Sequence, residues 1–569
     1  MMTTKRMLAL LFSVLLLLCP VLSACGGEEE EVSTQSEKEN SHKEDGKEES
    51  SHGTNNESSY VDIVIPEDES SLPGEESEPE NSQDSSLPPD VSDEISGDVS
   101  GDVSGDTSSE PSGEIYYQDE NGMYVLDGVY MPAFPSLQTT FTVCVYGNGI
   151  QNTYYSEEIA SDVYGSRIEN YVKLRNSDLH RDLGVTVQGY RVDDVVATLR
   201  MDAVAGTASY DAAMPFLPGA VLLAQDSALH DLNNFSSYIH FDAPWWESEI
   251  NDIMEIDGHQ YFAVGDITFS QKRAAIAVLF NKSITTELGY NLYDLVKGGG
   301  WTMDKMFEIA KANVADTDGT PGMSHTDDWG LVGSYNIATY HYLASGQTLL
   351  KVEANGTPKI SLDSADSLTT MLKVLQTLHA QNSSILNVQK LTGVADVWNV
   401  GLDVFDQGRA VFYTTPLVAV GKLRSNANVD FGILPMPKTT AAQKEYYTPV
   451  SGQSAYGICI PATAVDPLFS AYMIEAMACY SKNTVTPEYT EGLLRSRNSA
   501  DWDSRDMLDL IFDTMHYDLG MVVNMGGAGN LLSTMYRDNI TAVASKVYAT
   551  IPPVQEAIDE YLLGYRINY

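Results

Sequence analysis

Residues 139–146 read TTFTVCVY, and residues 184–190 read GVTVQGY. Both runs are rich in β-branched and aromatic residues, which is typical of strands. Residues 158–179 between them show helical periodicity, so this stretch predicts a strand, a helix and a second strand. Strands separated by helices of this length indicate parallel βαβ units, and in such α/β sheets ligands bind beyond the carboxyl ends of the strands.

The same alternation continues toward the C-terminus. We predict a helix over 191–205, a strand over 210–215 and the start of another helix over 219–225. A chain of 569 residues is too long for one ordinary hydrophobic core, so it should form two or more folded units.

Five short segments then follow one another in an order that is found in a known family. They are Tyr210-Asp211 with Leu229-His230-Asp231-Leu232, Gly258-His259-Gln260-Tyr261 with Phe280-Asn281-Lys282, Trp301-Thr302-Met303-Asp304, Phe405 to Phe412, and Phe431 to Pro437. In this order the chain resembles the extracellular solute-binding proteins of ABC importers, in the family 1 group that includes sugar-binding members. The alternative is that all five are core strands and helix starts of some other α/β protein.

The resemblance implies two α/β lobes joined by two or three crossing strands, the periplasmic-binding-protein-like fold, with ligand trapped between the lobes by hinge closure. By matching segments, lobe 1 covers 137–270 and 452–499. Lobe 2 covers 271–450 and 500–569. The stretch 116–136 precedes the start that is usual in the family, and no role is assigned to it.

The N-terminus has the features of an export signal. Lys5 and Arg6 precede an apolar run over 7–18, and the small residues Ser23 and Ala24 follow. Residues 1–24 are therefore predicted to be a secretory signal peptide, too short for a stable membrane span. The ending LSACG at 22–26 resembles the bacterial lipobox, which makes Cys25 the lipidated residue and places the protein on the extracellular face of the cell membrane. An ordinary signal that happens to place a cysteine there is the alternative.

Residues 25–115 have the composition of a disordered acidic linker. Glu, Asp, Ser, Gly and Pro dominate, large apolar residues are rare, and the motif SGDV occurs at 96–99 and again at 100–103. A flexible chain of this length reaches about 50 Å, and like charges extend it further. The formal net charge of the whole chain is -47, which would repel nucleic acid and anionic lipid, so we expect no nucleic-acid partner.

The remaining cysteines and the common catalytic motifs indicate no redox, metal or enzymatic function. Cys144, Cys459 and Cys479 lie in strand-like or helix-like runs, so we predict buried, unpaired thiols. Asn152 stands where a dinucleotide fingerprint needs its third glycine. Residues 452–456 read GQSAY and lack the last glycine of a nucleophile elbow. No histidine pair has metal-ligand spacing, although a glycosidase-like carboxylate pair stays open because its members need only be neighbours in space.

One acidic turn has two interpretations. Asp316, Asp318, Asp327 and Asp328 bring carboxylates near Gly319, as a calcium ion prefers. The glycine comes two positions too early for an EF-hand loop, and the bidentate glutamate is missing. We prefer a solvated turn and keep calcium at Asp316, Asp318 and Asp328 as the alternative; no other cofactor is expected.

We therefore predict a non-enzymatic, monomeric binding protein that captures a small solute, a sugar or oligosaccharide, for the permease subunits of an ABC importer. The abundance of Tyr and Trp supports this ligand class, since their flat faces cover sugar C–H surfaces. In sugar-binding relatives the segment after Gly408 often continues G-P-W, and here Thr415-Pro416-Leu417 lacks that aromatic. The ligand positions that the resemblance implies, together with two further tryptophan candidates, are Gly147, Asn148, Phe216, Trp245, Ser334, Tyr335, Asn336, Trp398, Thr414, Thr415, Gly452 and Tyr456.

Core packing is the alternative for each of these aromatic residues. At the level of function, a surface glycan-binding lipoprotein that is not coupled to a permease is the second hypothesis. A secreted lipoprotein enzyme is the third.

Overall fold

The computed structural model describes residues 115–147, 156–160, 167–353, 356–426, 428–494 and 502–567. The contacts divide the chain into Met1–Ser104 and Gly105–Tyr569, and all described residues belong to the second unit. The predicted signal peptide, Cys25 and the linker up to residue 114 lie outside the described residues. Among the helices that are described, none has the length and apolar character needed to cross a membrane.

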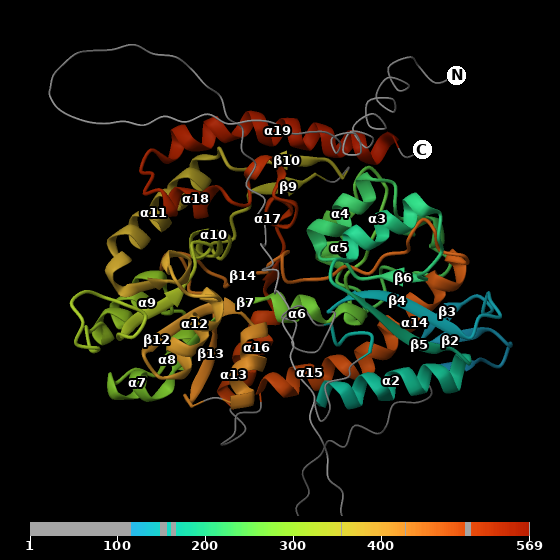
Figure 1. The fold of residues 1–569 in the computed structure, drawn as a ribbon, viewed down its shortest axis with the longest axis horizontal. Coiled ribbons are helices and arrows are strands. Elements are labelled where there is room, and N and C mark those ends of the chain that lie inside the picture. Colours follow the sequence, from blue (N-terminus) through green and yellow to red (C-terminus); the bar gives the residue numbers. More distant parts are fainter. Residues whose placement is uncertain are drawn as a thin grey trace, which may run out of the picture. The chain divides into compact units, whose positions relative to one another are not determined.

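A parallel sheet of three strands, here called sheet A, has the order β5-β4-β6 (Figure 1). Its central strand carries the apolar run that the sequence indicates, and Phe141, Val143 and Cys144 are fully buried. The strands of sheet A and the helices that follow them are β4 (Thr140–Tyr146), α2 (Arg167–Leu183), β5 (Thr186–Val192), α3 (Val195–Ala205), β6 (Ala212–Ala213), α4 (Leu217–Gln225), η1 (Leu232–Phe235), α5 (Ser248–Met254) and η2 (Asp266–Thr268). The predicted βαβ order over 139–215 is therefore confirmed.

A second sheet of five strands, here called sheet B, has the order β11-β8-β12-β7-β13. Only β7 runs antiparallel to its neighbours, and almost every residue of these strands is buried, which explains their continuous apolar runs. The strands are β7 (Ile276–Asn281), β8 (Trp329–Gly333), β11 (Ile385–Asn387), β12 (Ala410–Pro416) and β13 (Phe431–Pro435).

Helices flank sheet B, and the small hairpin β9-β10 in the same part of the sequence lies beside α17 and α19 (Figure 1). The flanking helices and the hairpin strands are α7 (Lys282–Glu287), α8 (Leu292–Lys297), α9 (Met303–Ala310), η3 (Lys311–Asn313), α10 (Ile337–Leu343), β9 (Leu350–Val352), β10 (Pro358–Ile360), α11 (Ala365–Ala380), η4 (Asn382–Ser384), η5 (Val388–Lys390), α12 (Val397–Asp406) and α13 (Val418–Asn426).

The segments that carry the family resemblance hold one another in place. The Asp231 carboxylate accepts the Gln260 backbone N–H at 3.0 Å, which ties the first segment to the second. The Trp301 indole donates to the Pro435 carbonyl at 2.9 Å, which ties the third segment to the last. At Gly432 a Cβ would lie 2.3 Å from the Phe280 ring, so that strand tolerates only glycine there. These motif residues are therefore structural.

Two segments connect the sheets. Helix α6 (Ser270–Ala274) leads from sheet A to β7, and residues 450–456 lead back. The Ala274 carbonyl accepts the Ser451 N–H at 3.0 Å, so the two segments pair where they cross. The Ser270 hydroxyl accepts the Tyr456 N–H at 2.9 Å.

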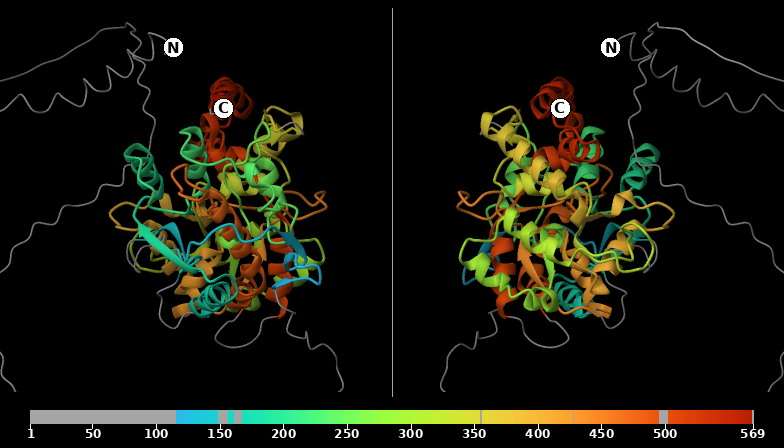
Figure 2. Two further views of the ribbon diagram at one scale, coloured as in Figure 1. Left: turned by 90° about the vertical axis from the view of Figure 1, so that its right-hand side faces the viewer. Right: turned by 90° about the vertical axis from the view of Figure 1, so that its left-hand side faces the viewer.

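The C-terminal elements contact both sides of the molecule. They are β14 (Thr448–Pro449), α14 (Pro467–Asn483), α15 (Val485–Leu494), α16 (Trp502–Asp513), β15 (Met515–His516), α17 (Leu519–Val523), η6 (Met525–Gly527), α18 (Leu531–Arg537) and α19 (Val543–Ile567). Helices α14 and α15 pack on α2, whereas α16 packs on β13. Helix α19 contacts α11 and β10 on the sheet B side and α4 on the sheet A side (Figures 1 and 2), and α17 also contacts α4. The last helices thus contact elements beside both sheets.

The stretch before the usual family start forms a small antiparallel sheet, β1 (Tyr116–Gln118), β2 (Tyr124–Leu126) and β3 (Val129–Met131). It packs on α14: the Tyr472 hydroxyl donates to the Tyr116 hydroxyl at 3.0 Å, and the Phe134 ring meets Tyr472 edge-on at 5.1 Å. Leu126 and Met131 are 1% and 2% exposed, so this sheet extends the core.

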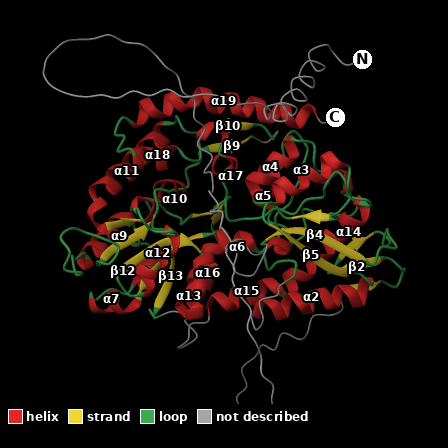
Figure 3. Cartoon of the chain, viewed as in Figure 1, coloured by secondary structure: helices red, strands yellow, loops and turns green. Residues whose placement is uncertain are grey.

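Two sequence predictions can be compared directly with the structure (Figure 3). The helix predicted from residue 158 is described only from Arg167 onward, and Glu158 lies in an irregular segment. Arg175 and Arg191 explain this difference, because both donate to carbonyl groups within 156–160 and hold that backbone away from a helix. The prediction for the thiols is confirmed, since Cys144, Cys459 and Cys479 are free and buried.

Candidate functional site

The carboxyl ends of both sheets lie at the connecting segments. Strand β7 starts directly after α6, and its register places Pro416 at the end of β12 beside Ile276. Phe216 follows β6 and forms a β-bridge with Tyr456, where the return segment reaches sheet A. Ligands of open α/β sheets bind beyond the carboxyl ends of the strands, so the region around α6 is the candidate site.

Three aromatic rings are stacked at the carboxyl end of sheet A. The centroid of Phe216 lies 4.7 Å from that of Tyr146 and 4.6 Å from that of Tyr456. Tyr146 and Tyr456 are 8% and 4% exposed, whereas Phe216 keeps a larger accessible part. Burial raises the pKa of Tyr146, so its hydroxyl stays protonated. This cluster places an aromatic, apolar face at the carboxyl end of sheet A.

A cavity of about 230 Å³ lies between the segments that follow the two sheets. Part of its wall follows β4 and includes Glu157. Another part follows β12 and begins at Leu417. Among the described residues that line it are Glu157, Phe269, Arg273, Leu417, Glu488 and Tyr489. The volume suits one small solute with an apolar face and several polar groups.

Arg273 of α6 is the cationic group in this wall. Its Nη1 donates to Glu158 Oε1 at 3.1 Å, and the other carboxylate oxygen of Glu158 accepts the Ser156 hydroxyl at 2.6 Å. Glu158 is fully buried and the Arg273 side chain is 18% exposed. Burial disfavours the charged guanidinium, but the nearby Glu158 carboxylate outweighs it and raises the pKa of Arg273. The arginine is therefore charged at any physiological pH.

Tyr489 of α15 supplies a polar group that has no partner. Its hydroxyl oxygen is buried and makes no hydrogen bond within the described part of the chain. Its ring lies 5.2 Å from that of Phe269, and burial raises the pKa of the phenol. A buried hydroxyl without a partner costs about 1–3 kcal/mol, which a ligand oxygen would recover.

The predicted ligand residues on the sheet A side fall into four groups. Phe216 and Tyr456 are brought together, as described above. Gly147 follows β4 with φ of 108° and donates to the Val192 carbonyl at 3.1 Å, while Asn148 lies outside the described residues. Trp245 is 1% exposed, so the core-packing alternative fits it. Gly452 packs against α17, where a Cβ would lie 2.9 Å from the Val522 Cα, so its smallness serves packing.

The predicted residues on the sheet B side all lie near the carboxyl ends of its strands. Ser334, Tyr335 and Asn336 follow β8, and the Ser334 hydroxyl accepts the Asn336 N–H at 3.2 Å. Thr414 and Thr415, on β12, are 4% and 5% exposed. The Tyr335 ring meets Tyr536 edge-on at 5.9 Å.

Trp398 stands apart from the other tryptophan candidate because its side chain is 52% exposed. It lies in the first turn of α12, where the Asp396 carboxylate caps the helix by accepting its N–H at 2.9 Å. Because α12 leads back to the start of β12, its own start lies toward the carboxyl ends of the sheet B strands. Trp398 thus offers an indole face on the same side of sheet B as Tyr335.

Sequence reasoning missed Phe269, Arg273 and Tyr489. Arg273 had a signal: it is a charged residue directly before AAIAVLF, a run that becomes the buried strand β7. Its long side chain must leave the core there, toward the connection. Tyr489 carried no such signal, because its position depends on how α15 packs.

The acidic turn brings together Asp316, Asp318 and Asp327, not Asp328. The Asp327 carboxylate accepts backbone N–H groups of Thr317, at 2.8 Å, and Ser324, at 2.7 Å. Hydrogen bonds from Thr326, Thr320 and Ser324 lower the pKa of Asp318 to about 2. These bonds fix the turn, and its three carboxylates offer oxygen atoms within 4.8 Å of one another, so both interpretations of the turn stay predictions, with Asp327 in place of Asp328.

The comparisons with known proteins give structural matches only. No protein-family model matches the chain, and no curated protein matches its sequence. Solved ABC solute-binding proteins match the structure across most of the chain. An ABC substrate-binding protein from Listeria monocytogenes in complex with cycloalternan is 13% identical, with a TM-score of 0.48, and the match covers 74% of this chain and 99% of that one.

Two further structures are similar to the same extent. An ABC transporter associated binding protein from B. animalis subsp. lactis, in complex with beta-1,6-galactobiose, is 16% identical with a TM-score of 0.49, over 74% of this chain and 98% of that one. A solute-binding protein from Thermotoga lettingae, bound with alpha-D-tagatose, is 13% identical with a TM-score of 0.48, over 74% of this chain and all 100% of that one. The site described above rests on the strands and contacts of this chain itself.

Proposed function

We propose that this protein is a solute-binding protein that captures a small solute, a sugar or oligosaccharide, and delivers it to the permease subunits of an ABC importer. One observation carries the proposal. The carboxyl ends of two α/β sheets lie at the segments that connect them, and a cavity of about 230 Å³ with apolar, aromatic and charged walls lies there. Such a cavity suits reversible capture.

The same proposal includes two lobes that close on the ligand. Lobe 1 covers 137–270 and 452–499, and lobe 2 covers 271–450 and 500–569. The closed state is favoured when one ligand contacts both lobes. The aromatic cluster of sheet A supplies a stacking face, and Ser334, Thr414 and Thr415 supply hydroxyl groups on the sheet B side.

A lipid anchor at Cys25 completes the proposal. The lipobox-like sequence at 22–26 supports it, and the chain acts as a monomer held on the extracellular face of the cell membrane by the acidic linker. Cys25→Ala should release the protein or leave it unprocessed, because the acyl chains supply the membrane affinity. Membrane fractionation after alkaline washing measures this, and a processed variant that stays membrane-bound would contradict the anchor.

The binding function is tested by a thermal-shift screen of the whole chain against sugars, oligosaccharides, peptides and polyamines. A ligand that binds only the native state raises the melting temperature. We expect a sugar or oligosaccharide to do so without being consumed. Turnover of the ligand would identify an enzyme instead, and a shift with peptides or polyamines alone would contradict the sugar assignment.

Trp398→Ala and Tyr548→Ala form a matched pair of variants for this screen. Trp398 and Tyr548 of α19 are 52% and 56% exposed, so removing either ring should change the free energy of unfolding by less than about 0.5 kcal/mol. Only Trp398 lies toward the carboxyl ends of sheet B. Weaker oligosaccharide binding in Trp398→Ala, with normal binding in Tyr548→Ala, would support the site; equal binding in both would remove Trp398 from it.

A further inference from the structure

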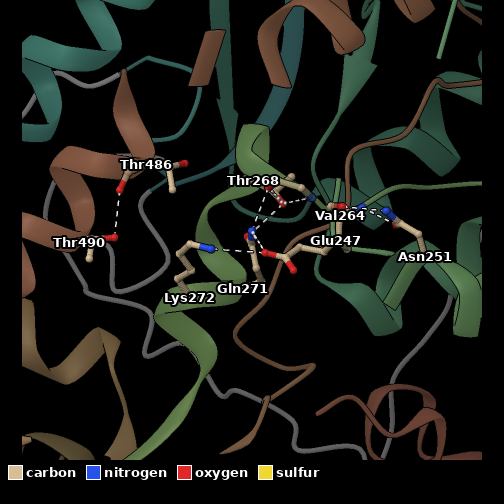
Figure 4. A network of polar contacts seen from close by, with 9 residues as sticks. Glu247, Asn251, Val264, Thr268, Gln271, Lys272, Thr486 and Thr490 are labelled. Carbon is tan, nitrogen blue, oxygen red and sulfur yellow. Dashed lines mark hydrogen bonds and ion pairs between the residues drawn. The ribbon is translucent and has the colours of Figure 1, made fainter. Parts of the chain in front are cut away.

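Helix α6 is attached to both sides of the molecule. On the sheet A side, the Gln271 amide donates to the Gly265 carbonyl at 3.1 Å and to Glu247 at 3.4 Å (Figure 4). On the sheet B side, the Ala275 carbonyl just beyond the helix accepts the Leu417 N–H at 2.9 Å. Any movement of one sheet relative to the other must therefore pass through α6 and its neighbours.

Arg273 is the α6 side chain that lines the cavity. A guanidinium has five N–H donors, and one of them bonds to Glu158. Within the described part of the chain, the guanidinium makes no other hydrogen bond. Glu158 belongs to the segment after β4, so the ion pair also joins α6 to the carboxyl end of sheet A. The remaining donors are left for an occupant of the cavity.

We propose that Arg273 is a specificity-determining residue of this site and that it couples the bound solute to α6. The proposal deepens the proposed function and rests on it. The planar guanidinium matches two neighbouring oxygen atoms, and the unpartnered Tyr489 hydroxyl provides for a third. The solute class is thus a small compound with adjacent hydroxyl groups and one apolar face, which packs on Leu417 and Phe269.

Two acidic residues share the cavity wall with Arg273. Glu157 and Glu488 also line it, so repulsion by Arg273 alone does not decide which solutes are excluded. A response to spermidine in the experiment below would therefore indicate binding through these acidic residues and not through the guanidinium.

Lys272 provides a control on the same helix. It carries the same charge, but its Nζ lies 3.4 Å from Glu247 and 5.4 Å from the centre of the Phe512 ring, and it is not among the residues of the cavity wall. A change that acts only through the charge or stability of α6 should appear in both variants. A change that acts through the cavity should appear only at Arg273.

The experiment compares the whole wild-type chain with Arg273→Met, Arg273→Lys and Lys272→Met. Glucose, galactose, maltotriose and spermidine serve as probes in thermal-shift and calorimetric titrations. For a sugar that binds the wild type, we expect Arg273→Met to lose about tenfold or more in affinity, as removal of a charged hydrogen-bond donor does. Arg273→Lys should keep part of the wild-type affinity, and the affinity of Lys272→Met should stay within about twofold of the wild type.

Hydrogen exchange tests the coupling without a ligand. In Arg273→Met we expect faster deuterium uptake in peptides that cover 156–160 and 270–275 together, because the ion pair that joins them is lost. Lys272→Met should leave 156–160 unchanged. Glu158→Gln, which keeps the shape of the side chain, should reproduce the uptake of Arg273→Met, and it replaces that variant should Arg273→Met fail to fold.

The outcomes separate this inference from the proposed function. Sugar binding that is unchanged in Arg273→Met would overturn the role of Arg273 and leave the proposed function standing. A response to spermidine alone would overturn the solute class. Should none of the sugars bind the wild type, the proposed function would fail, and unchanged uptake at 156–160 would then overturn the coupling as well.

Discussion

The carboxyl ends of sheets A and B meet the same connecting segments but are built differently. At sheet A, the rings of Tyr146, Phe216 and Tyr456 contact one another, and two of the three are almost fully buried. At sheet B, the positions after β8 and within β12 carry short hydroxyl side chains such as Ser334 and Thr414. The first is a preformed apolar face, and the second is a set of hydrogen-bonding groups. The sugar of the proposed function would stack on the first and form hydrogen bonds with the second.

The largest loss of stability is expected when a ring is removed from the aromatic cluster at sheet A. Tyr456→Ala should lower the free energy of unfolding by about 3–5 kcal/mol, because a buried ring is replaced by a cavity. Chemical denaturation measures the loss. Tyr190→Ala is the control, since Tyr190 is also an aromatic residue of the sheet A side but is 55% exposed, and it should change stability by less than about 0.5 kcal/mol. Similar losses in both variants would contradict the packed cluster.

A second effect concerns two buried carboxyl groups beside the connecting region. Burial raises the pKa of Asp266, which precedes α6, and of Asp518, which caps α17, to about 6. Between pH 4 and pH 6 the folded chain then keeps protons that the unfolded chain has lost. Stability should therefore fall as the pH rises through this window and level off above it, by up to about 3 kcal/mol for each group.

The measurement is the free energy of unfolding from pH 4 to pH 8. Asp518→Asn should flatten this curve, because the amide can still accept the Met521 N–H but does not titrate. A wild-type protein that gains stability from pH 4 to pH 7 would contradict the prediction.

Part of the fold could be predicted from the sequence. The strand pattern of TTFTVCVY and of the buried run AVLFN depends on neighbouring residues, so β4 and β7 could be predicted from the sequence. The segments that carry the family resemblance could be found in the sequence because each is a short run of neighbouring residues. In the structure they are joined by hydrogen bonds: Asp231 bonds to Gln260, and Trp301 to Pro435.

The site was only partly predictable. Phe216 and Tyr456 were both candidates, although 240 positions separate them, because each follows or enters a strand at the expected edge. Arg273 and Tyr489 were not found. Their place in the cavity depends on how α6 and α15 pack, and that depends on contacts between residues far apart in the chain. The start of α2 was mispredicted for a similar reason, since Arg175 and Arg191 hold the preceding segment.

A smaller effect, on solute binding, tests the sheet A side and the sheet B side of the site together. Phe216→Ala and Tyr335→Ala should each weaken solute binding by about 1–3 kcal/mol, tenfold to a hundredfold, if the rings stack on ligand. Both side chains are only partly buried, so their melting temperatures should fall less than that of Tyr456→Ala. Calorimetry and thermal melting on the same samples separate the two causes. Normal binding combined with early melting would assign both rings to the core.

The smallest change in stability is expected at the hydroxyl groups on the sheet B side. The Thr414 hydroxyl is buried at 4% residue exposure and has no hydrogen-bond partner in the described part of the chain. Thr414→Val replaces it with a methyl group of similar size, so the folded state no longer buries an unsatisfied hydroxyl. Stability should stay equal or rise by about 1 kcal/mol. Thr415→Val is the control, because the Thr415 hydroxyl donates to the Pro416 carbonyl at 3.3 Å and would lose that bond.

Measuring solute binding by Thr414→Val tests whether the Thr414 hydroxyl contacts the solute. If sheet B holds the solute by hydrogen bonds, Thr414→Val should weaken binding by about 0.5–1.5 kcal/mol while the protein melts no earlier than the wild type. Denaturation and titration of one preparation test both parts. A variant that is more stable and binds equally well would show that Thr414 is an unfilled position in the core, and the hydroxyl side of the site would then rest on Ser334 and Thr415.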